Sequence, residues 1–164
     1  CEQIADQMPV FRSKPFVAGC IYWTYQDYGV RGEAFVMGVV DVDRNRRPSW
    51  VALRDEYAPL WFESVDVDPS GSRRNATVTL RTRGPIERDL PVYTLRGYHL
   101  SWQVLGSDEG QVLSEGALTL PVLPPESTWS GEVEWMDAEG ASALVLRVVR
   151  PTGFTVIERT DHIN

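Results

Sequence analysis

Residues 97–105 read GYHLSWQVL, and this stretch alternates regularly between apolar and polar side chains. Tyr98, Leu100, Trp102 and Val104 fall on one side of an extended chain, and the polar residues between them fall on the other. Alternation of this kind is typical of a β-strand with one buried and one exposed face. We therefore expect a strand here, with its aromatic and aliphatic face in a core.

The same alternating pattern of apolar and polar residues continues from residue 61 to the end of the sequence. Short alternating runs are separated by turn residues about every 8–12 positions, which is the pattern of an all-β sandwich. The expected strands are residues 62–67, 75–83, 97–105, 111–120, 130–136, 142–150 and 154–159. Their number and the length of this region predict a mainly β fold, an immunoglobulin-like β-sandwich over residues 61–164.

The first 60 residues have a different pattern. Residues 1–13 are expected to form the end of a helix that stops or kinks near Met8, because Pro9 follows. An apolar strand is expected within PFVAGCIYWTYQDYG, residues 15–29, and a second helix within residues 49–61. A buried strand between helices needs parallel neighbours on both edges, and this chain offers none. Residues 1–60 therefore read as a piece of a larger α/β architecture.

Two segments carry a family resemblance. AGCIYWTYQDYG at 18–29 and GVVDVDRNRRPSWVALRDEY at 38–57 resemble the close of the catalytic barrel in glycoside hydrolase family 2, which includes β-galactosidases, β-glucuronidases and β-mannosidases. Residues 89–104 and 110–116 are similar to the sandwich that follows that barrel. The resemblance implies that residues 1–60 are the C-terminal end of a (β/α)₈ barrel (helix, eighth strand, loop, last helix) and that residues 61–164 are the sandwich.

The resemblance also implies a sugar site. Strand ends open onto the substrate in such barrels, so Phe16–Ile21 would fill the barrel wall and Trp23 would form the floor of the sugar subsite. Without the resemblance, Trp23 reads as an ordinary core aromatic. Asp27 either orients groups of the substrate site or hydrogen-bonds the loop.

Catalysis in this family uses two glutamates for double displacement with retention. The resemblance places neither glutamate in this chain, and Asp27 with Glu33 is rejected as a catalytic pair. The chain would be the C-terminal fragment of a retaining β-glycosidase and inactive alone. Residues 34–37 lack the Asn-x-Lys motif of glucuronidases, so the expected substrates are terminal neutral β-glycosides, with β-galactosides favoured and mannosides open.

Composition and charge limit the classes of partner and ligand that we expect for this protein. A net charge of −7 argues against nucleic acid, which needs a concentrated basic face. No apolar run is long enough for a membrane helix, and no leader peptide is recognised. Asp41, Asp43 and Asn45 imitate a calcium loop, but Arg46 and Ala52 replace its essential glycine and glutamate. We expect no metal and no cofactor, a cytoplasmic location ahead of a secreted one, and leave a homo-oligomer open.

A different class of function stays open. The sandwich alone reads as a non-catalytic immunoglobulin-like module, either structural, at an interface, or binding carbohydrate through Trp129 and Trp135. Core packing is favoured for both tryptophans. The structural interpretation therefore ranks above carbohydrate binding for residues 61–164.

Overall fold

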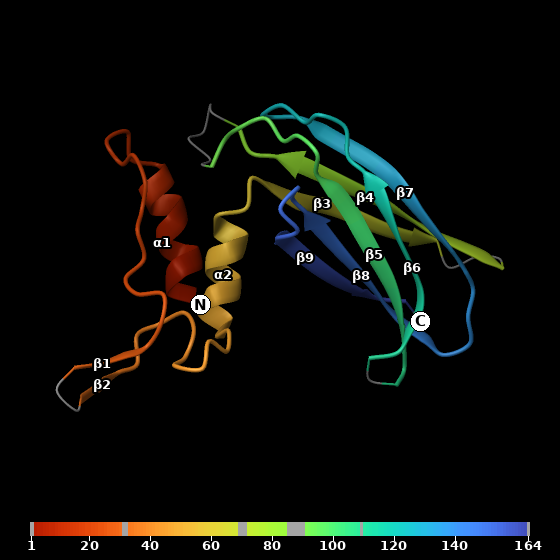
Figure 1. The fold of residues 1–164 in the computed structure, drawn as a ribbon. Helices are drawn as coiled ribbons and strands as arrows, with labels where there is room; N and C mark the ends of the chain where they lie inside the picture. Colours follow the sequence, from red (N-terminus) through yellow and green to blue (C-terminus); the bar gives the residue numbers. More distant parts are fainter. Residues whose placement is uncertain (1, 31–32, 69–71, 85–90, 109, 164) are drawn as a thin grey trace. The chain divides into compact units, whose positions relative to one another are not determined.

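The computed structural model describes residues 2–30, 33–68, 72–84, 91–108 and 110–163. The chain divides into two compact units, whose elements are labelled in Figure 1. The N-terminal unit contains Cys1–Tyr57, and the sandwich unit contains Ala58–Pro85 and Pro91–Asn164.

The sandwich unit consists of two antiparallel sheets (Figure 1). One sheet has the order β3-β4-β7 and the other has the order β6-β5-β8-β9. The strands are β3 (Leu60–Asp68), β4 (Arg73–Thr82), β5 (His99–Gly106), β6 (Val112–Thr119), β7 (Thr128–Met136), β8 (Ala141–Val149) and β9 (Thr155–His162). All seven expected strands are present, and the prediction of a mainly β sandwich is confirmed.

The core of the sandwich unit follows the predicted alternation. Leu100 and Val104 are fully buried, and Tyr98 and Trp102 are nearly so. Trp102 lies opposite Leu146 on β8, which is also fully buried. The intervening polar residues of β5 are only half-buried, because they point to the outer face of their sheet.

A polar network crosses that outer face. Gln103 on β5 donates to Glu115 on β6 at 2.9 Å and accepts from Arg147 on β8 at 2.7 Å. Arg147 also donates to Glu158 on β9 at 2.5 Å. Cross-strand polar pairs of this kind add to the stability of a sheet. This network links all four strands of the sheet.

The N-terminal unit contains two helices and a short hairpin. The helices are α1 (Glu2–Arg12) and α2 (Pro48–Glu56), and the hairpin pairs β1 (Tyr28–Val30) with β2 (Glu33–Phe35). Arg12 at the end of α1 donates to Glu56 at the end of α2 at 2.6 Å. Pro48 occupies the first turn of α2, where a missing N–H costs nothing. The helix expected within residues 49–61 is thereby confirmed, ending at Glu56.

The expectation that the first helix stops near Met8 is wrong, whereas the alternative of a kink there stays a prediction. Helix α1 continues through Pro9 to Arg12. Proline removes one intrahelical hydrogen bond and crowds the carbonyl four residues before it. Only three residues of α1 follow Pro9, and the Pro9 carbonyl still accepts from the Ser13 N–H at 3.0 Å. The cost is therefore confined to the last turn.

The buried strand expected over Phe16–Ile21 is not formed in this structure. The segment forms no strand, and the side chains of Phe16 and Ile21 are 81% and 96% exposed. An isolated parallel strand leaves its backbone N–H and C=O groups unpaired, and neighbouring strands normally satisfy them. No described segment pairs with residues 16–21, so the barrel wall that the resemblance implied is not formed here.

Candidate functional site

Trp23 is the most exposed of the predicted site residues. Its side chain is 75% exposed, and the peptide bond between Trp23 and Thr24 is cis. A core position for this indole is excluded in the N-terminal unit as it stands here. An indole presented in this way offers a flat apolar face to a ligand.

The backbone after Trp23 is held by a short ladder of hydrogen bonds. The carbonyl of Thr24 accepts from the Val39 N–H at 3.2 Å, and the carbonyl of Tyr25 accepts from the Val40 N–H at 3.0 Å. The Asp27 N–H then donates to the Val40 carbonyl at 3.2 Å. Residues 24–27 are therefore paired with residues 39–40, beginning one position after Trp23.

Both carboxylate oxygens of Asp27 accept hydrogen bonds from other residues of the protein. Its Oδ1 accepts from the Gly38 N–H at 2.8 Å and from Nη1 of Arg47 at 2.8 Å, and its Oδ2 accepts from Nη2 of Arg47. The hydrogen bond from Arg47 holds the pKa of Asp27 below its ordinary value, and the Gly38 N–H adds to the effect. Asp27 thus makes the loop hydrogen bonds that were one of its two predicted roles. Contact with a sugar stays a prediction.

A second acidic loop lies beside this one. Oδ1 of Asp41 accepts from the backbone N–H groups of Asp43 and Asn45 at 2.9 and 2.8 Å, and Oδ2 accepts from Nδ2 of Asn45 at 2.9 Å. These bonds, led by the one from the Asn45 side chain, lower the pKa of Asp41. The residues that imitate a calcium loop in the sequence thus form a turn closed by one carboxylate.

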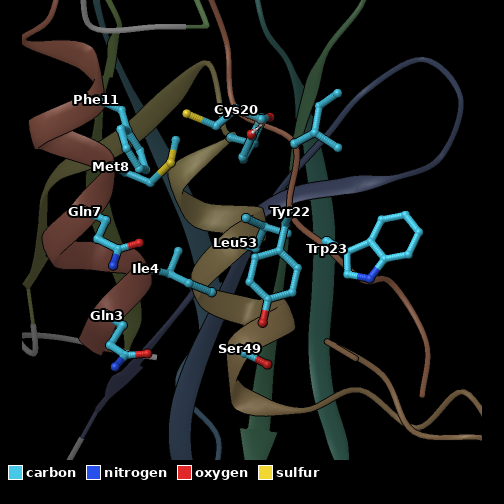
Figure 2. Close-up of a pocket in the computed structure, with 12 residues that line it drawn as sticks. Gln3, Ile4, Gln7, Met8, Phe11, Cys20, Tyr22, Trp23, Ser49 and Leu53 are labelled. Atoms are coloured by element: carbon cyan, nitrogen blue, oxygen red, sulfur yellow. Dashed lines mark hydrogen bonds between the residues drawn. The ribbon is translucent and has the colours of Figure 1, made fainter. Parts of the chain in front are cut away.

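A pocket of about 450 Å³ lies between α1, α2 and residues 20–23 (Figure 2). Its polar lining comes from Gln3, Gln7 and Ser49. The hydroxyl of Tyr57 donates to the carbonyl of Cys20, which ties the end of α2 to the segment that carries Trp23.

The rest of the pocket lining is largely apolar. Ile4, Met8 and Phe11 extend from α1 towards α2 in Figure 2, where Leu53 lies on the facing helix. The indole of Trp23 points outward, away from α1. Apolar walls with a few amide and hydroxyl groups are common in ligand sites.

The two predicted substrate residues are placed differently. Trp23 lines the pocket, whereas Asp27 does not. Sequence reasoning missed Arg47 and Gly38, which hold Asp27. Both residues lie in the quoted segment 38–57, but nothing in their spacing indicates that they meet Asp27. Glu33, rejected above as a catalytic partner of Asp27, lies in β2, and its side chain is outside what the structure describes.

Other chemistry is limited in the described part of the chain. Within it, no three metal-binding side chains come together, and neither helix is long and apolar enough to cross a bilayer. Cys20 is a free, half-buried thiol that lines the pocket. The exposed indole of Trp23, which lines the same pocket, is the side chain of the N-terminal unit that is best placed to contact a ligand.

No protein-family model and no curated protein matches the chain. Solved structures to which it is similar include a Pseudomonas fluorescens alkylpurine DNA glycosylase bound to DNA (13% identity, TM-score 0.40, 65% of this chain and 31% of that one). A Thermotoga neapolitana β-glucosidase 3B in complex with glycerol matches at 12% identity and a TM-score of 0.38, over 66% of this chain and 16% of that one. A penta-heme cytochrome c552 from Thermochromatium tepidum matches at 12% identity and a TM-score of 0.49, over 96% and 50%.

The chain therefore spans half or less of each of these three proteins. These three proteins have names that denote unrelated activities, and all three TM-scores lie below 0.5, so the similarity does not indicate what this chain does. What the comparisons provide is a weak structural similarity to proteins that include a β-glucosidase.

Proposed function

We propose that this chain is the C-terminal part of a retaining β-glycosidase of glycoside hydrolase family 2. Residues 1–60 would close its catalytic barrel, and residues 61–164 would form its immunoglobulin-like sandwich. The substrates would be terminal neutral β-glycosides, with β-galactosides favoured. The observation that carries the proposal is the exposed indole of Trp23, which follows directly on an exposed apolar segment.

The apolar segment supports the barrel interpretation. Phe16 and Ile21 are among the most exposed large apolar side chains of the described residues, and Val36 and Met37 are exposed in the same unit. Clustered apolar exposure usually marks a surface that another part of a protein covers. Barrel strands on either side would cover this segment and pair its backbone, which would turn residues 16–21 into a strand.

The role of Trp23 follows from the chemistry of a neutral sugar. One face of a pyranose presents C–H bonds, which pack on an aromatic ring, while its hydroxyl groups seek polar partners. Trp23 would supply the ring, and Asp27 would belong to the same site. The two glutamates that perform double displacement would come from the preceding part of the barrel. This chain would therefore contribute sugar binding and leave bond cleavage to other residues.

The sandwich unit supports a structural role for residues 61–164. Trp135 is only 3% exposed and belongs to the core, and Trp129 packs against that core. The Trp135 indole is therefore not available to stack on a ligand, and that of Trp129 is only partly exposed. The first, second and fifth strands of the unit form one sheet and the other four form the second, whereas the constant-type immunoglobulin arrangement places the fourth strand in the first sheet.

The test is hydrolysis by the gene product extended upstream of residue 1. Nitrophenyl β-galactoside, β-glucoside, β-mannoside and β-glucuronide are compared, and NMR follows the anomer released first. We expect cleavage of a neutral β-glycoside with retention, and a fall of at least tenfold in kcat/KM in Trp23→Ala, which corresponds to about 1.4 kcal/mol. Trp61→Phe in the sandwich unit is the matched control. Absence of hydrolysis, or equal rates in Trp23→Ala and the parent, would overturn the proposal.

A further inference from the structure

We propose that Asp27 and Arg47 are a positioning pair that fixes the backbone beneath Trp23. Asp27 would then serve the site by holding the loop and would not touch the sugar. The sugar-binding part of this inference rests on the proposed function, whereas the ordering of Trp23 is independent of it.

The carboxylate of Asp27 has little capacity left for a ligand. Its two oxygens receive three hydrogen bonds, from Gly38 and from both terminal nitrogens of Arg47. An ionised carboxylate has about four acceptor sites. One acceptor site remains, and the Asp27 side chain is only 9% exposed, so a sugar hydroxyl has little access to it.

Arg47 forms hydrogen bonds with two segments of the loop, residue 27 and residues 38–39. Its Nη1 also donates to the carbonyl of Gly38 at 2.9 Å, and its backbone N–H donates to the carbonyl of Val39 at 3.0 Å. The planar guanidinium can hold a carboxylate at two points, which a lysine ammonium cannot do. Arg47 therefore ties residue 27 to residues 38–39 immediately before α2 begins.

Because Gly38 has no side chain, its backbone can lie very close to the backbone of residues 27 and 40. A Cβ at this position would lie 2.4 Å from the Val40 carbonyl oxygen and 2.5 Å from the Asp27 nitrogen, both of them backbone atoms. No side chain fits there without moving the loop. The backbone segments around residue 27 and residues 38–40 are thus in direct contact at the point where Asp27 and Arg47 meet.

This contact determines how well Trp23 is held. Three-quarters of the indole is exposed, so its own packing contributes little to its order. The backbone is fixed from Thr24 onward by pairing with Val39, and the Asp27–Arg47 pair closes that paired segment. A platform that is ordered in advance loses less conformational entropy when a ligand binds.

The test uses the full chain labelled with 5-fluorotryptophan, in which the ¹⁹F resonance of Trp23 is identified by its loss in Trp23→Phe. Asp27→Asn, Arg47→Gln and the double variant are compared with Arg12→Gln, which removes the ion pair with Glu56 elsewhere in the same unit. We expect the Trp23 resonance to narrow and move towards that of the free amino acid in all three loop variants, with no further change in the double variant.

The five other tryptophan resonances report whether each variant is folded. Arg47→Lys, which keeps the charge, should give an intermediate Trp23 shift. An unchanged Trp23 resonance in both single variants would overturn the inference. An equal response to Arg12→Gln would also overturn it, because that result would indicate general loosening of the unit.

Titration of the protein extended upstream of residue 1 with methyl β-galactoside and other neutral methyl β-glycosides separates this inference from the proposed function. If the sugar shifts the Trp23 resonance, binding should be about tenfold weaker in Asp27→Asn, a factor that corresponds to 1.4 kcal/mol. Weaker binding with an unchanged Trp23 resonance in the free variant would mean direct contact between Asp27 and sugar, and would overturn the inference alone. If no neutral methyl β-glycoside shifts the Trp23 resonance in the parent protein extended upstream of residue 1, the proposed function fails, whereas a Trp23 response to Asp27→Asn still supports the positioning pair.

Discussion

Trp102 on β5 lies directly opposite Gly116 on β6, and the glycine leaves the space that the indole fills. A Cβ at Gly116 would lie 2.7 Å from Cζ2 of Trp102. Trp102 is 9% exposed and belongs to the core, so it has little freedom to move aside. The size of residue 116 is therefore limited by an aromatic ring on the neighbouring strand.

Gly116→Ala should destabilise the sandwich unit, because overpacking a core typically costs about 1–3 kcal/mol. The measurement is urea unfolding followed by fluorescence. Ala117→Ser, at the next and exposed position of β6, is the control and should change stability by less than about 0.5 kcal/mol. Equal stabilities of the parent and Gly116→Ala would show that the sheet adjusts freely at this point.

The Tyr98 hydroxyl should make the sandwich unit sensitive to alkali. Burial raises the pKa of Tyr98, and a 3.1 Å hydrogen bond with the Tyr93 hydroxyl adds to the effect. An unfolded tyrosine ionises near pH 10, so the stability that Tyr98 contributes is complete below that pH and is lost as the pH rises. Urea unfolding at pH 8 and pH 11 should show a smaller loss in Tyr98→Phe than in the parent. A loss of the same size in both proteins would contradict this assignment.

Acid should weaken the loop of the N-terminal unit through Asp27. Because the folded-state pKa of Asp27 is lowered, its stabilising contribution is complete above the unfolded value, near 3.8, and is lost as the pH falls below it. Hydrogen exchange of residues 24–40 at pH 6 and pH 3 should therefore differ strongly in the parent and less in Asp27→Asn. Asp41 titrates in the same direction, so Asp41→Asn is measured alongside. An unchanged acid response in Asp27→Asn would remove Asp27 as a cause.

The apolar segment of the N-terminal unit should bind a hydrophobic dye. Phe16 and Ile21 are more exposed than any large apolar side chain described in the sandwich unit. The double variant Phe16→Ser/Ile21→Ser should bind less 8-anilinonaphthalene-1-sulfonate, with stability changed by less than about 0.5 kcal/mol, as is usual for surface positions. Val122→Ser in the sandwich unit, at a residue that is 51% exposed, should leave dye binding unchanged. Equal dye binding by the parent and the double variant would place the dye elsewhere.

The strands of the sandwich were predictable because each is indicated by residues that are close together in the sequence. Alternation along 97–105 and turn residues between the runs indicated each strand before any partner was known. The pairing of β4 with β7 was not predictable in the same way, because these strands lie far apart in the sequence and only packing brings them together. The expected strand at residues 16–21 failed for the complementary reason. Its apolar composition is local, but a parallel strand exists only if neighbours complete its hydrogen bonds.

The candidate site was also only partly predictable from the sequence. Trp23 became a site candidate through the resemblance of residues 18–29 to a known family, because the order of residues alone reads it as an ordinary core aromatic. The role of Asp27 was left between two alternatives, and its bonds to Gly38 and Arg47 became visible only in the structure. These partners lie 11 and 20 positions away along the chain.

By itself, the sequence determined the strands of the sandwich and a second helix beginning at about residue 49, because periodicity and turn chemistry act over a few residues. Only the tertiary structure decided which strands share a sheet, that Gly116 makes room for Trp102, and that Arg47 holds Asp27. Those relationships depend on shape and charge meeting across the fold, and distance along the chain does not encode them.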